Sequence, residues 1–437
     1  MRKPVALVLT WFLGAGLLSS ATAGEVVILT SFPKEMFEPY AAAFKAHDSG
    51  TEVVVKSKAT SACVAYLRET RSRPDVDVVW ASATDAFAAL AKDGLLARCE
   101  LPAELRRRIP AKVGPYPVHD PGGRYFGFAL SGYGIMWNVP YLQSYQLPRP
   151  SDWPELADPR YFGHLSMCAP SRSGTTHLLV EAILQEYGWD RGWRLLLEIC
   201  GNVATLTERS FGVPQGIGTG EFGLGLVIDF MALSAKAAGQ PVDFAYPPRS
   251  PIVPASAGVV TGAPHPEAAA RFVAFLLSDE GQRLLLDPTI SRLPVVPALY
   301  AQAPAGYPNP FTMAATNRTF DPALSEARYE MVNVLFDQVV TFRLQELKDA
   351  WQAIHQAEAA VAARAAGLPE ARAALDSARL LAGAVPVSAA QAADPAFANG
   401  LSAADRRASQ EAAWDAASKA AYQRARDLAV QAHEAAR

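Results

Sequence analysis

Residues 25–58 have the sequence EVVILTSFPKEMFEPYAAAFKAHDSGTEVVVKSK, and their pattern predicts the architecture of the whole chain. Short apolar runs at 25–31 and 51–58 are typical of buried strands, and a helix is predicted between them at 37–46. Residues 77–80, DVVW, give a third strand that is followed by another helix. Strands that alternate with helices in this order form a parallel sheet with crossover helices. The first unit of the chain is therefore predicted to be α/β.

Hydroxyl side chains follow each of these three strands. Ser31 ends the first strand, and Ser82 follows the third. Thr60 and Ser61 lie just beyond the second. Ligands of parallel α/β sheets bind at the carboxyl ends of the strands. Each residue could also serve only as the N-cap of the next helix, but three successive strand ends with the same chemistry predict one wall of a polar ligand site.

A second candidate site lies at residues 169–184, APSRSGTTHLLVEAIL, where Pro, Ser and Gly precede an apolar helical run. Ser173 and Thr175 place hydroxyls at the start of that helix, and Gly174 lets the backbone approach a ligand closely. The free N–H groups of a helix N-terminus attract anions, and Arg172 adds a positive charge beside them. The alternative is an ordinary capped helix start.

Composition restricts the class of protein. The chain has 437 residues, of which 50% are hydrophobic and 19% charged, and its formal net charge is −3. This balance argues against nucleic acid or an anionic membrane as the main partner and leaves a small anionic ligand open. The seven histidines show no HExxH or paired-ligand spacing, and the sequence contains no GxSxG motif. We therefore expect neither catalytic residues nor a metal or cofactor site.

Residues 1–23 have the pattern of a secretory signal peptide, with a basic start, an apolar core and an A-T-A cleavage site. The mature chain is expected in a bacterial periplasm, where disulfides can form. The four cysteines permit the pairs Cys63–Cys99 and Cys168–Cys200, or four buried thiols. The sequence leaves both possibilities open.

A second α/β unit is predicted after the capped helix. Residues 125–138 are rich in Gly and aromatic side chains and predict a pair of strands with no helix between them, suited to a crossing between units. Further strands are predicted at 203–206 and 226–229, and the chain returns to the first unit at 242–248. The expected result is two lobes with a cleft between them, which is a common place for ligand sites.

Beyond residue 310 the composition becomes rich in Ala, Glu and Arg, with apolar residues at helical spacing. This pattern predicts long helices separated by Gly- and Pro-containing turns. Such an extension could pack on the lobes, remain partly disordered, or dock to a partner.

Longer motifs connect these pieces in order along the chain. They are RPDVDVVWASATDAFAALAKDGLL at 73–96, SDWPELADPRYFGHLSMCAPSRSGTT at 151–176 and the segment 241–297 that begins PVDFAYPPRSPIVPASAGVV. Together they resemble the extracellular solute-binding proteins of ABC transporters, with the type 2 periplasmic-binding fold and the ferric-ion, thiamine, phosphonate and sugar-phosphate subgroup as the nearest match. The SFPKEM start and the long C-terminal extension are most similar to the phosphoglycerate transport regulatory type.

The resemblance, which covers about residues 25–300, implies two parallel-sheet lobes joined by a hinge, with a helical C-terminal extension. The implied divisions are a signal peptide at 1–23, the first part of lobe 1 at 24–130, lobe 2 at 131–250, the second part of lobe 1 at 251–310, and the Ala-rich extension at 311–437.

The resemblance also implies a function. A small anionic, phosphorylated solute would be captured between the lobes by hinge closure and delivered to an ABC permease in the inner membrane. The alternatives are a ligand-loaded subunit that signals to a membrane histidine kinase, or a ferric-ion or thiamine binder of the same group. Ferric-binding relatives carry adjacent tyrosines near the position of Asp229 and Phe230, and this chain has no such pair, which argues against iron.

The implied ligand residues come from both lobes. Asp229 could receive a ligand hydroxyl or ammonium group, or it could cap the helix that follows. Tyr246 could span the cleft wall or pack as a strand aromatic. Among the candidate cations, Arg172 and Arg209 rank ahead of Arg249 and Arg292. The expected site residues are Ser31, Thr60, Ser61, Ser82, Arg172, Ser173, Gly174, Thr175, Asp229 and Tyr246.

Overall fold

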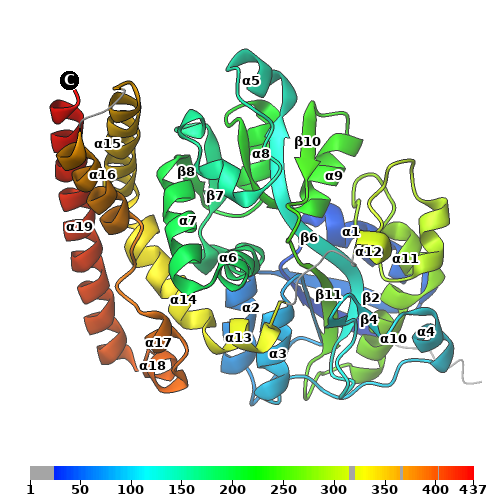
Figure 1. The fold of residues 1–437 in the computed structure, drawn as a ribbon. Helices are drawn as coiled ribbons and strands as arrows, with labels where there is room; N and C mark the ends of the chain where they lie inside the picture. Colours follow the sequence, from blue (N-terminus) through cyan, green and yellow to red (C-terminus); the bar gives the residue numbers. More distant parts are fainter. Residues whose placement is uncertain (1–23, 314–319, 365–367, 402) are drawn as a thin grey trace, which may run out of the picture.

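The computed structural model describes residues 24–313, 320–364, 368–401 and 403–437 (Figure 1). The predicted signal peptide, residues 1–23, lies outside the described residues. Strands from both halves of the chain join in one curled, ten-stranded sheet, and its main path runs β2-β1-β3-β11-β6-β9-β7-β8. Helices cover both faces, which is the arrangement that the alternation of strands and helices predicts.

The first half of the sheet is the parallel unit expected from the opening residues. In this unit β1 pairs in parallel with both β2 and β3. Apolar side chains such as Val26 and Ile28 are buried on one face, while Val27 and Leu29 belong to a second cluster on the other. Burial of both faces explains why these strands are nearly continuous apolar runs. The elements are β1 (Gly24–Thr30), α1 (Lys34–His47), β2 (Thr51–Ser57), α2 (Thr60–Glu69), β3 (Val78–Ala81) and α3 (Thr84–Lys92).

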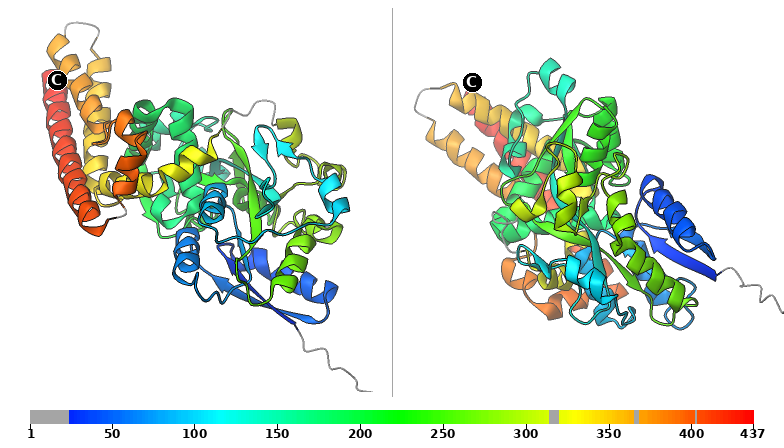
Figure 2. Two further views of the ribbon diagram at one scale, coloured as in Figure 1. Left: turned by 90° about the horizontal axis from the view of Figure 1, so that it is seen from below. Right: turned by 90° about the vertical axis from the view of Figure 1, so that its right-hand side faces the viewer.

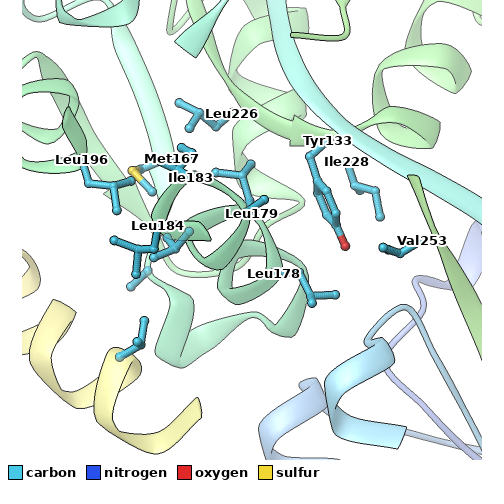
Figure 3. Close-up of a cluster of buried hydrophobic side chains, with 14 of the residues drawn as sticks. Tyr133, Met167, Leu178, Leu179, Ile183, Leu184, Leu196, Leu226, Ile228 and Val253 are labelled. Carbon is cyan, nitrogen blue, oxygen red and sulfur yellow. The ribbon is translucent and has the colours of Figure 1, made fainter. Parts of the chain in front are cut away.

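The second half repeats this plan in lobe 2, where β7 pairs in parallel with β8 and β9. Figure 3 shows α6 packed on these strands, with Leu179 and Ile183 among the buried side chains that include Met167 and Leu226. The elements of this lobe are β7 (Leu165–Cys168), α6 (Gly174–Tyr187), α7 (Trp189–Gly201), β8 (Val203–Thr207), α8 (Gly212–Thr219), β9 (Leu224–Ile228) and α9 (Asp229–Ala237).

A single long strand, β6 (Phe126–Asn138), links the two lobes, and every one of its residues is buried. The sequence predicted a pair of strands here, whereas the structure has one uninterrupted strand. It runs antiparallel to β11 (Ile252–Val259), to β9 and to β10 (Val242–Ala245). Gly134 permits this close packing, because a Cβ there would lie 2.2 Å from the carbonyl oxygen of Ala245. The strands that link the two lobes thus form an antiparallel centre of the sheet, and parallel strands lie on either side of it.

Shorter elements complete the two lobes. Helix α10 (Pro266–Leu277) packs against β1 and β11 with its apolar face buried in the core. These elements are α4 (Ala103–Arg108), β4 (Lys112–Val113), β5 (Tyr116–Pro117), α5 (Val139–Ser144), α10 (Pro266–Leu277), α11 (Asp279–Leu284), β12 (Leu293–Pro294) and α12 (Pro310–Met313), with 3-10 turns η1 (Trp153–Ala157), η2 (Pro159–Tyr161), η3 (Pro170–Arg172) and η4 (Pro297–Gln302).

The C-terminal extension is helical and packs mainly on lobe 2, and its helix α13 (Pro322–Ala327) also contacts α3 of lobe 1. Helices α15, α16 and α19 lie against one another, and Figure 2 shows them projecting from one side of the molecule. Trp351 of α15 packs over Gly201 at the end of α7, and Trp189 Nε1 donates to the Val387 carbonyl at 2.7 Å. The elements are α13 (Pro322–Ala327), α14 (Tyr329–Phe336), a π-helical turn η6 (Asp337–Thr341), α15 (Leu344–Ala362), α16 (Pro369–Ala382), α17 (Ala389–Ala392), α18 (Pro395–Gly400) and α19 (Ala404–Ala435).

All four cysteines lie in the described part of the chain, and each is a free thiol there. Burial raises the pKa of the Cys63 thiol to about 12, so it is protonated at neutral pH. Of the two possibilities that the sequence left open, the structure shows the unpaired one. Among the residues described, no helix has the length and apolar character needed to cross a membrane.

Candidate functional site

A small pocket lies between the lobes, with a cavity volume of about 20 Å³ and an opening to solvent. It lies where the ends of β1 and β3 in lobe 1 meet the first turn of α6 in lobe 2. This is the position predicted for a ligand in an α/β sheet. Its lining residues are Ser31, Phe32, Pro33, Ala59, Thr60, Ser82, Arg172, Ser173, Thr175, Arg209, Ser210, Phe211, Phe230, Met231 and Arg292.

Hydroxyl groups from both lobes face this pocket, as the sequence predicted. Lobe 1 supplies Ser31, Thr60 and Ser82, and lobe 2 supplies Ser173 and Thr175. Thr60 is the first residue of α2, and Ser173 is the N-cap of α6, whose Oγ accepts from the Thr176 N–H at 3.3 Å. The starts of two helices therefore point their positive dipole ends toward the same space.

Ser61 and Gly174 hold the lobes together and do not line the pocket. Ser61 Oγ donates to the Ser171 carbonyl across the lobe boundary at 3.4 Å. A Cβ at Gly174 would lie 3.0 Å from Thr60 Cβ. Gly174 is therefore approached by Thr60 of the opposite lobe, and its role as a ligand contact stays a prediction.

Asp229 and Tyr246 also lie outside the lining, and their role as ligand contacts stays a prediction. Asp229 is fully buried as the first residue of α9. Its Oδ2 accepts from the Gly132 N–H at 2.7 Å and from the Tyr246 hydroxyl at 3.0 Å, and Oδ1 accepts from the Phe230 N–H at 2.7 Å. Burial raises the pKa of Asp229 to about 6. Both carboxylate oxygens are thus satisfied by the protein itself.

Arg292 is the cation most deeply placed in the pocket, although the sequence ranked it behind Arg172 and Arg209. It is 0% exposed, and its guanidinium carbon lies 4.4 Å from the Phe32 ring centre and 3.9 Å from that of Phe230. Nη2 donates to Ser82 Oγ at 2.8 Å. Within the described structure, Nε and Nη1 have no hydrogen-bond partner.

Burial lowers the pKa of Arg292 to about 10, so the group is still charged at neutral pH. A buried guanidinium that makes one side-chain hydrogen bond is costly to the protein unless another group uses its remaining donors. The planar N–H donors of arginine match the oxygens of a phosphate or carboxylate. Arg292 is therefore a group that an anion in this pocket would stabilise.

Two further arginines reach the pocket from lobe 2. Arg172 Nη1 lies 3.4 Å from the Thr207 carbonyl and 3.7 Å from the exposed Glu208 carboxylate. Arg209 stacks over Phe211 with 5.1 Å between guanidinium carbon and ring centre. Arg249 instead pairs with Glu186 outside the pocket lining.

Among the residues that the structure describes, the lining contains three arginines and several hydroxyls and has no carboxylate, tyrosine or histidine. Ferric ion prefers anionic oxygen ligands, which this donor set does not provide. The same set suits an anion with several oxygens.

Sequence reasoning missed the apolar part of the site. Phe32 and Pro33 follow directly after Ser31, so their position at a strand end was a signal that could have been used. No local signal pairs Arg292 with Phe230, because they come from different lobes. Met231 and Phe211 likewise reach the pocket only through the packing of α8 and α9.

Comparisons with known proteins agree with this architecture. The family model for bacterial extracellular solute-binding proteins matches residues 76–313. The phosphoglycerate transport regulatory protein PgtC of Salmonella typhimurium is 34% identical over 348 residues, which cover 79% of this chain and 82% of the relative.

Solved structures show the same fold at low sequence identity. The periplasmic binding protein AfuA from Actinobacillus pleuropneumoniae, with fructose-6-phosphate bound, has a TM-score of 0.65 and 18% identity over 73% of this chain and 99% of its own. Iron-bound HitA from Pseudomonas aeruginosa has a TM-score of 0.59 and 18% identity over 71% and 98%.

The predicted fold class is confirmed: this is the type 2 periplasmic-binding-protein fold with a helical C-terminal region. The matched segment includes the pocket residues from Ser82 to Arg292, and the lobe 1 residues Ser31, Phe32, Pro33, Ala59 and Thr60 precede it. The chain therefore belongs to the family of bacterial extracellular solute-binding proteins, which bind solutes and are not enzymes.

Proposed function

We propose that the protein captures a small anionic, phosphorylated solute between its two lobes and delivers it to an ABC permease of the inner membrane. The observation that carries this proposal is Arg292, buried between Phe32 and Phe230 with two guanidinium nitrogens free of partners within the described residues. A phosphate group would supply acceptors for these two nitrogens and would add to the negative charge of Asp229, which already acts on this arginine.

The surrounding groups support the same ligand class. Arg172 and Arg209 add positive charge on the opposite wall, where the exposed Glu208 carboxylate lies 3.7 Å from Arg172. Ser173, Thr175 and the first turn of α6 offer hydroxyl and N–H donors, which is a common way to bind phosphate. The names of PgtC and of the fructose-6-phosphate complex of AfuA point to phosphorylated solutes in related proteins.

The proposal includes the organisation predicted from the sequence. Residues 1–23 direct export to the periplasm and are removed. Lobe 1 is formed by 24–130 and 251–310, lobe 2 by 131–250, and the lobes close on the ligand by a hinge because contacts to both of them favour the closed state.

A second candidate is ligand-dependent signalling to a membrane sensor. The helices beyond residue 320 favour this function. The match with AfuA covers 99% of AfuA but 73% of this chain, so part of this chain has no counterpart in AfuA and could serve a second partner. The relative PgtC is named a transport regulatory protein. In this version the loaded protein presents its C-terminal helices to a sensor histidine kinase.

The ligand class is tested by thermal unfolding with a panel of 3-phosphoglycerate, fructose 6-phosphate, methylphosphonate, thiamine and ferric citrate. A ligand at about 100 times its Kd stabilises the protein by about 2.7 kcal/mol. We expect this stabilisation from at least one phosphorylated compound in the parent and in Arg249→Gln, whose arginine lies outside the pocket lining. Stabilisation by ferric citrate or thiamine with none from the phosphorylated compounds would refute the proposal.

A further inference from the structure

Behind the pocket, the two lobes meet through a buried polar contact. Asp85 lies in the first turn of α3 in lobe 1, and His177 lies in the first turn of α6 in lobe 2. Both side chains are 0% exposed, and His177 Nε2 lies 3.4 Å from Asp85 Oδ2. Because neither group reaches water, each must find its hydrogen-bond partners within the protein.

Two residues of the C-terminal region complete this contact. Ser325 of α13 is buried, and its Oγ donates to Asp85 Oδ2 at 3.1 Å and lies 3.3 Å from His177 Nε2. His177 Nδ1 lies 2.8 Å from Asn333 Oδ1 of α14. The four side chains Asp85, His177, Ser325 and Asn333, which we call the clasp, therefore join lobe 1, lobe 2 and the extension.

Neighbouring contacts hold α13 in this place. Arg328 donates to both carboxylate oxygens of Glu181 on α6, each at 2.7 Å, and both side chains are nearly or fully buried. On the other side, Lys92 of α3 pairs with Glu326 at 3.1 Å. Figure 1 shows α13 beside α3. Since Ser325 of α13 also contacts His177 of α6, this one short helix contacts both lobes.

The clasp sits on the helices that carry the pocket. Ser82 precedes the first turn of α3, and Ser173 and Thr175 begin α6. A shift of α3 relative to α6 would change the distance between the hydroxyls of lobe 1 and those of lobe 2. Hydrogen bonds fix such a position more sharply than apolar contacts do, because they require one distance and one direction.

The geometry does not support a nucleophile, although it contains Ser, His and Asp. In a catalytic triad, the serine contacts one ring nitrogen of the histidine and the carboxylate binds the other. Here Ser325 and Asp85 both lie beside the same nitrogen, Nε2 of His177. All three side chains are also closed to solvent. The contact is therefore one that positions other groups.

We propose that Asp85, His177 and Ser325 are positioning residues for the anion pocket, so that the C-terminal region is part of the ligand-binding machinery. This inference rests on the proposed function for its effect on affinity. Loss of the clasp removes no side chain that lines the pocket. It allows the lobe 1 wall of the pocket to move relative to the lobe 2 wall.

The experiment compares Ser325→Ala with Ser418→Ala in the full-length protein. Ser418 is a buried serine of α19 whose Oγ has no hydrogen-bond partner in the described structure, so it is a matched control. Titration calorimetry with 3-phosphoglycerate and with inorganic phosphate measures affinity. Hydrogen exchange without ligand measures protection in the first turns of α3 and α6. Asp85→Asn, which keeps a hydrogen-bonding amide, is compared with Asp85→Ala.

We expect Ser325→Ala to bind both probes about tenfold more weakly and Ser418→Ala to stay within about twofold. Asp85→Asn should recover part of the affinity lost in Asp85→Ala. Faster exchange should be confined to the first turns of α3 and α6. If Ser325→Ala matches Ser418→Ala in affinity and exchange, or if its exchange rises evenly over the whole chain, the inference is wrong.

Failure of the proposed function gives a different result. The parent protein would then bind neither probe, whereas the exchange comparison would still decide whether the clasp aligns α3 with α6.

Discussion

Arg292 shows how one residue links stability to ligand binding. Its guanidinium group is removed from water, is held between two aromatic rings, and makes one side-chain hydrogen bond to Ser82. Such a group lowers the stability of the free protein and is compensated when an anion binds. Functional sites commonly hold groups that are unfavourable for stability alone.

Replacing Arg292 by Met tests this balance. The Met side chain fills much of the same space without a buried charge, so the ligand-free variant should have an unchanged or higher Tm. Affinity for 3-phosphoglycerate should fall at least about thirtyfold, because loss of one member of a buried charge pair costs about 2–5 kcal/mol. Calorimetric unfolding and titration measure the two effects. A variant that binds as tightly as its parent would contradict the role of Arg292.

His119 makes stability dependent on pH. Its ring packs 5.5 Å from that of Phe126, and neither ring nitrogen has a hydrogen-bond partner in the part of the chain described. Burial lowers the pKa of His119 from its ordinary value of 6.5 to about 4. The unfolded chain therefore takes up this proton first as the pH falls, so stability is lost between about pH 6.5 and pH 4 and is fully present above that range.

The variant His119→Leu should lose this part of the pH dependence. We expect the free energy of unfolding to fall less, by about 2–3 kcal/mol, between pH 7 and pH 4 than in the parent. Urea unfolding at four pH values gives the comparison, and other titrating groups cancel because the two proteins share them. Parallel curves for the two proteins would show that His119 is already solvated.

At the scale of elements, helix α6 serves three purposes along its length. Its start faces the pocket with Ser173 and Thr175, and His177 at the end of the first turn joins the clasp. Leu179 and Ile183 then fill the core beneath the sheet. Core packing fixes the helix in place, and this makes its N-terminus a rigid wall for a ligand.

Helix α15 depends on a glycine of its partner helix α7. A Cβ at Gly201 would lie 2.5 Å from Trp351 Cδ1. Gly201→Ala should therefore displace α15 and lower the free energy of unfolding by about 1–3 kcal/mol. The matched control is Gly50→Ala, where a Cβ meets nothing within 4 Å. Urea unfolding of both variants tests this, and equal stability would mean that the extension tolerates the displacement.

At the scale of the whole molecule, the extension is part of the folded protein. Trp351 covers the end of α7, and Lys348 Nζ donates to the Ala204 carbonyl at 3.2 Å. Tyr422 of α19 donates to the Val339 carbonyl at 2.8 Å. Apolar area buried in this way adds to the stability of lobe 2, at about 25 cal/mol for each Å² removed from water.

Removal of residues 345–437 should therefore lower the stability of lobe 2, in addition to any effect on the proposed signalling. The apolar surface of α7 would become exposed, and the Trp189 indole would lose its acceptor at Val387. We expect a lower Tm and increased binding of a hydrophobic dye, although the truncation removes no pocket residue. A truncated protein with the parent's Tm and no dye binding would show that lobe 2 is stable alone.

The sequence by itself determined the alternation of strands and helices, the hydroxyls at strand ends and the capped start of α6. These features depend on neighbours along the chain, through hydrophobic spacing and hydrogen bonds of local caps. Fold class and the pocket's position at the strand ends followed from them. The crossing strand β6 was expected as a pair, because its length depends on glycines that pack against β10 and β11.

Only the tertiary structure decided the chemistry of the pocket. Asp229 turns inward because Gly132 and Tyr246 supply its donors, and Arg292 enters the pocket because Phe32 and Phe230 meet around it. The clasp likewise needs α3, α6 and α13 in contact. Each of these arrangements brings together residues distant in sequence, and their free energy depends on burial and partners that exist only after the lobes have packed.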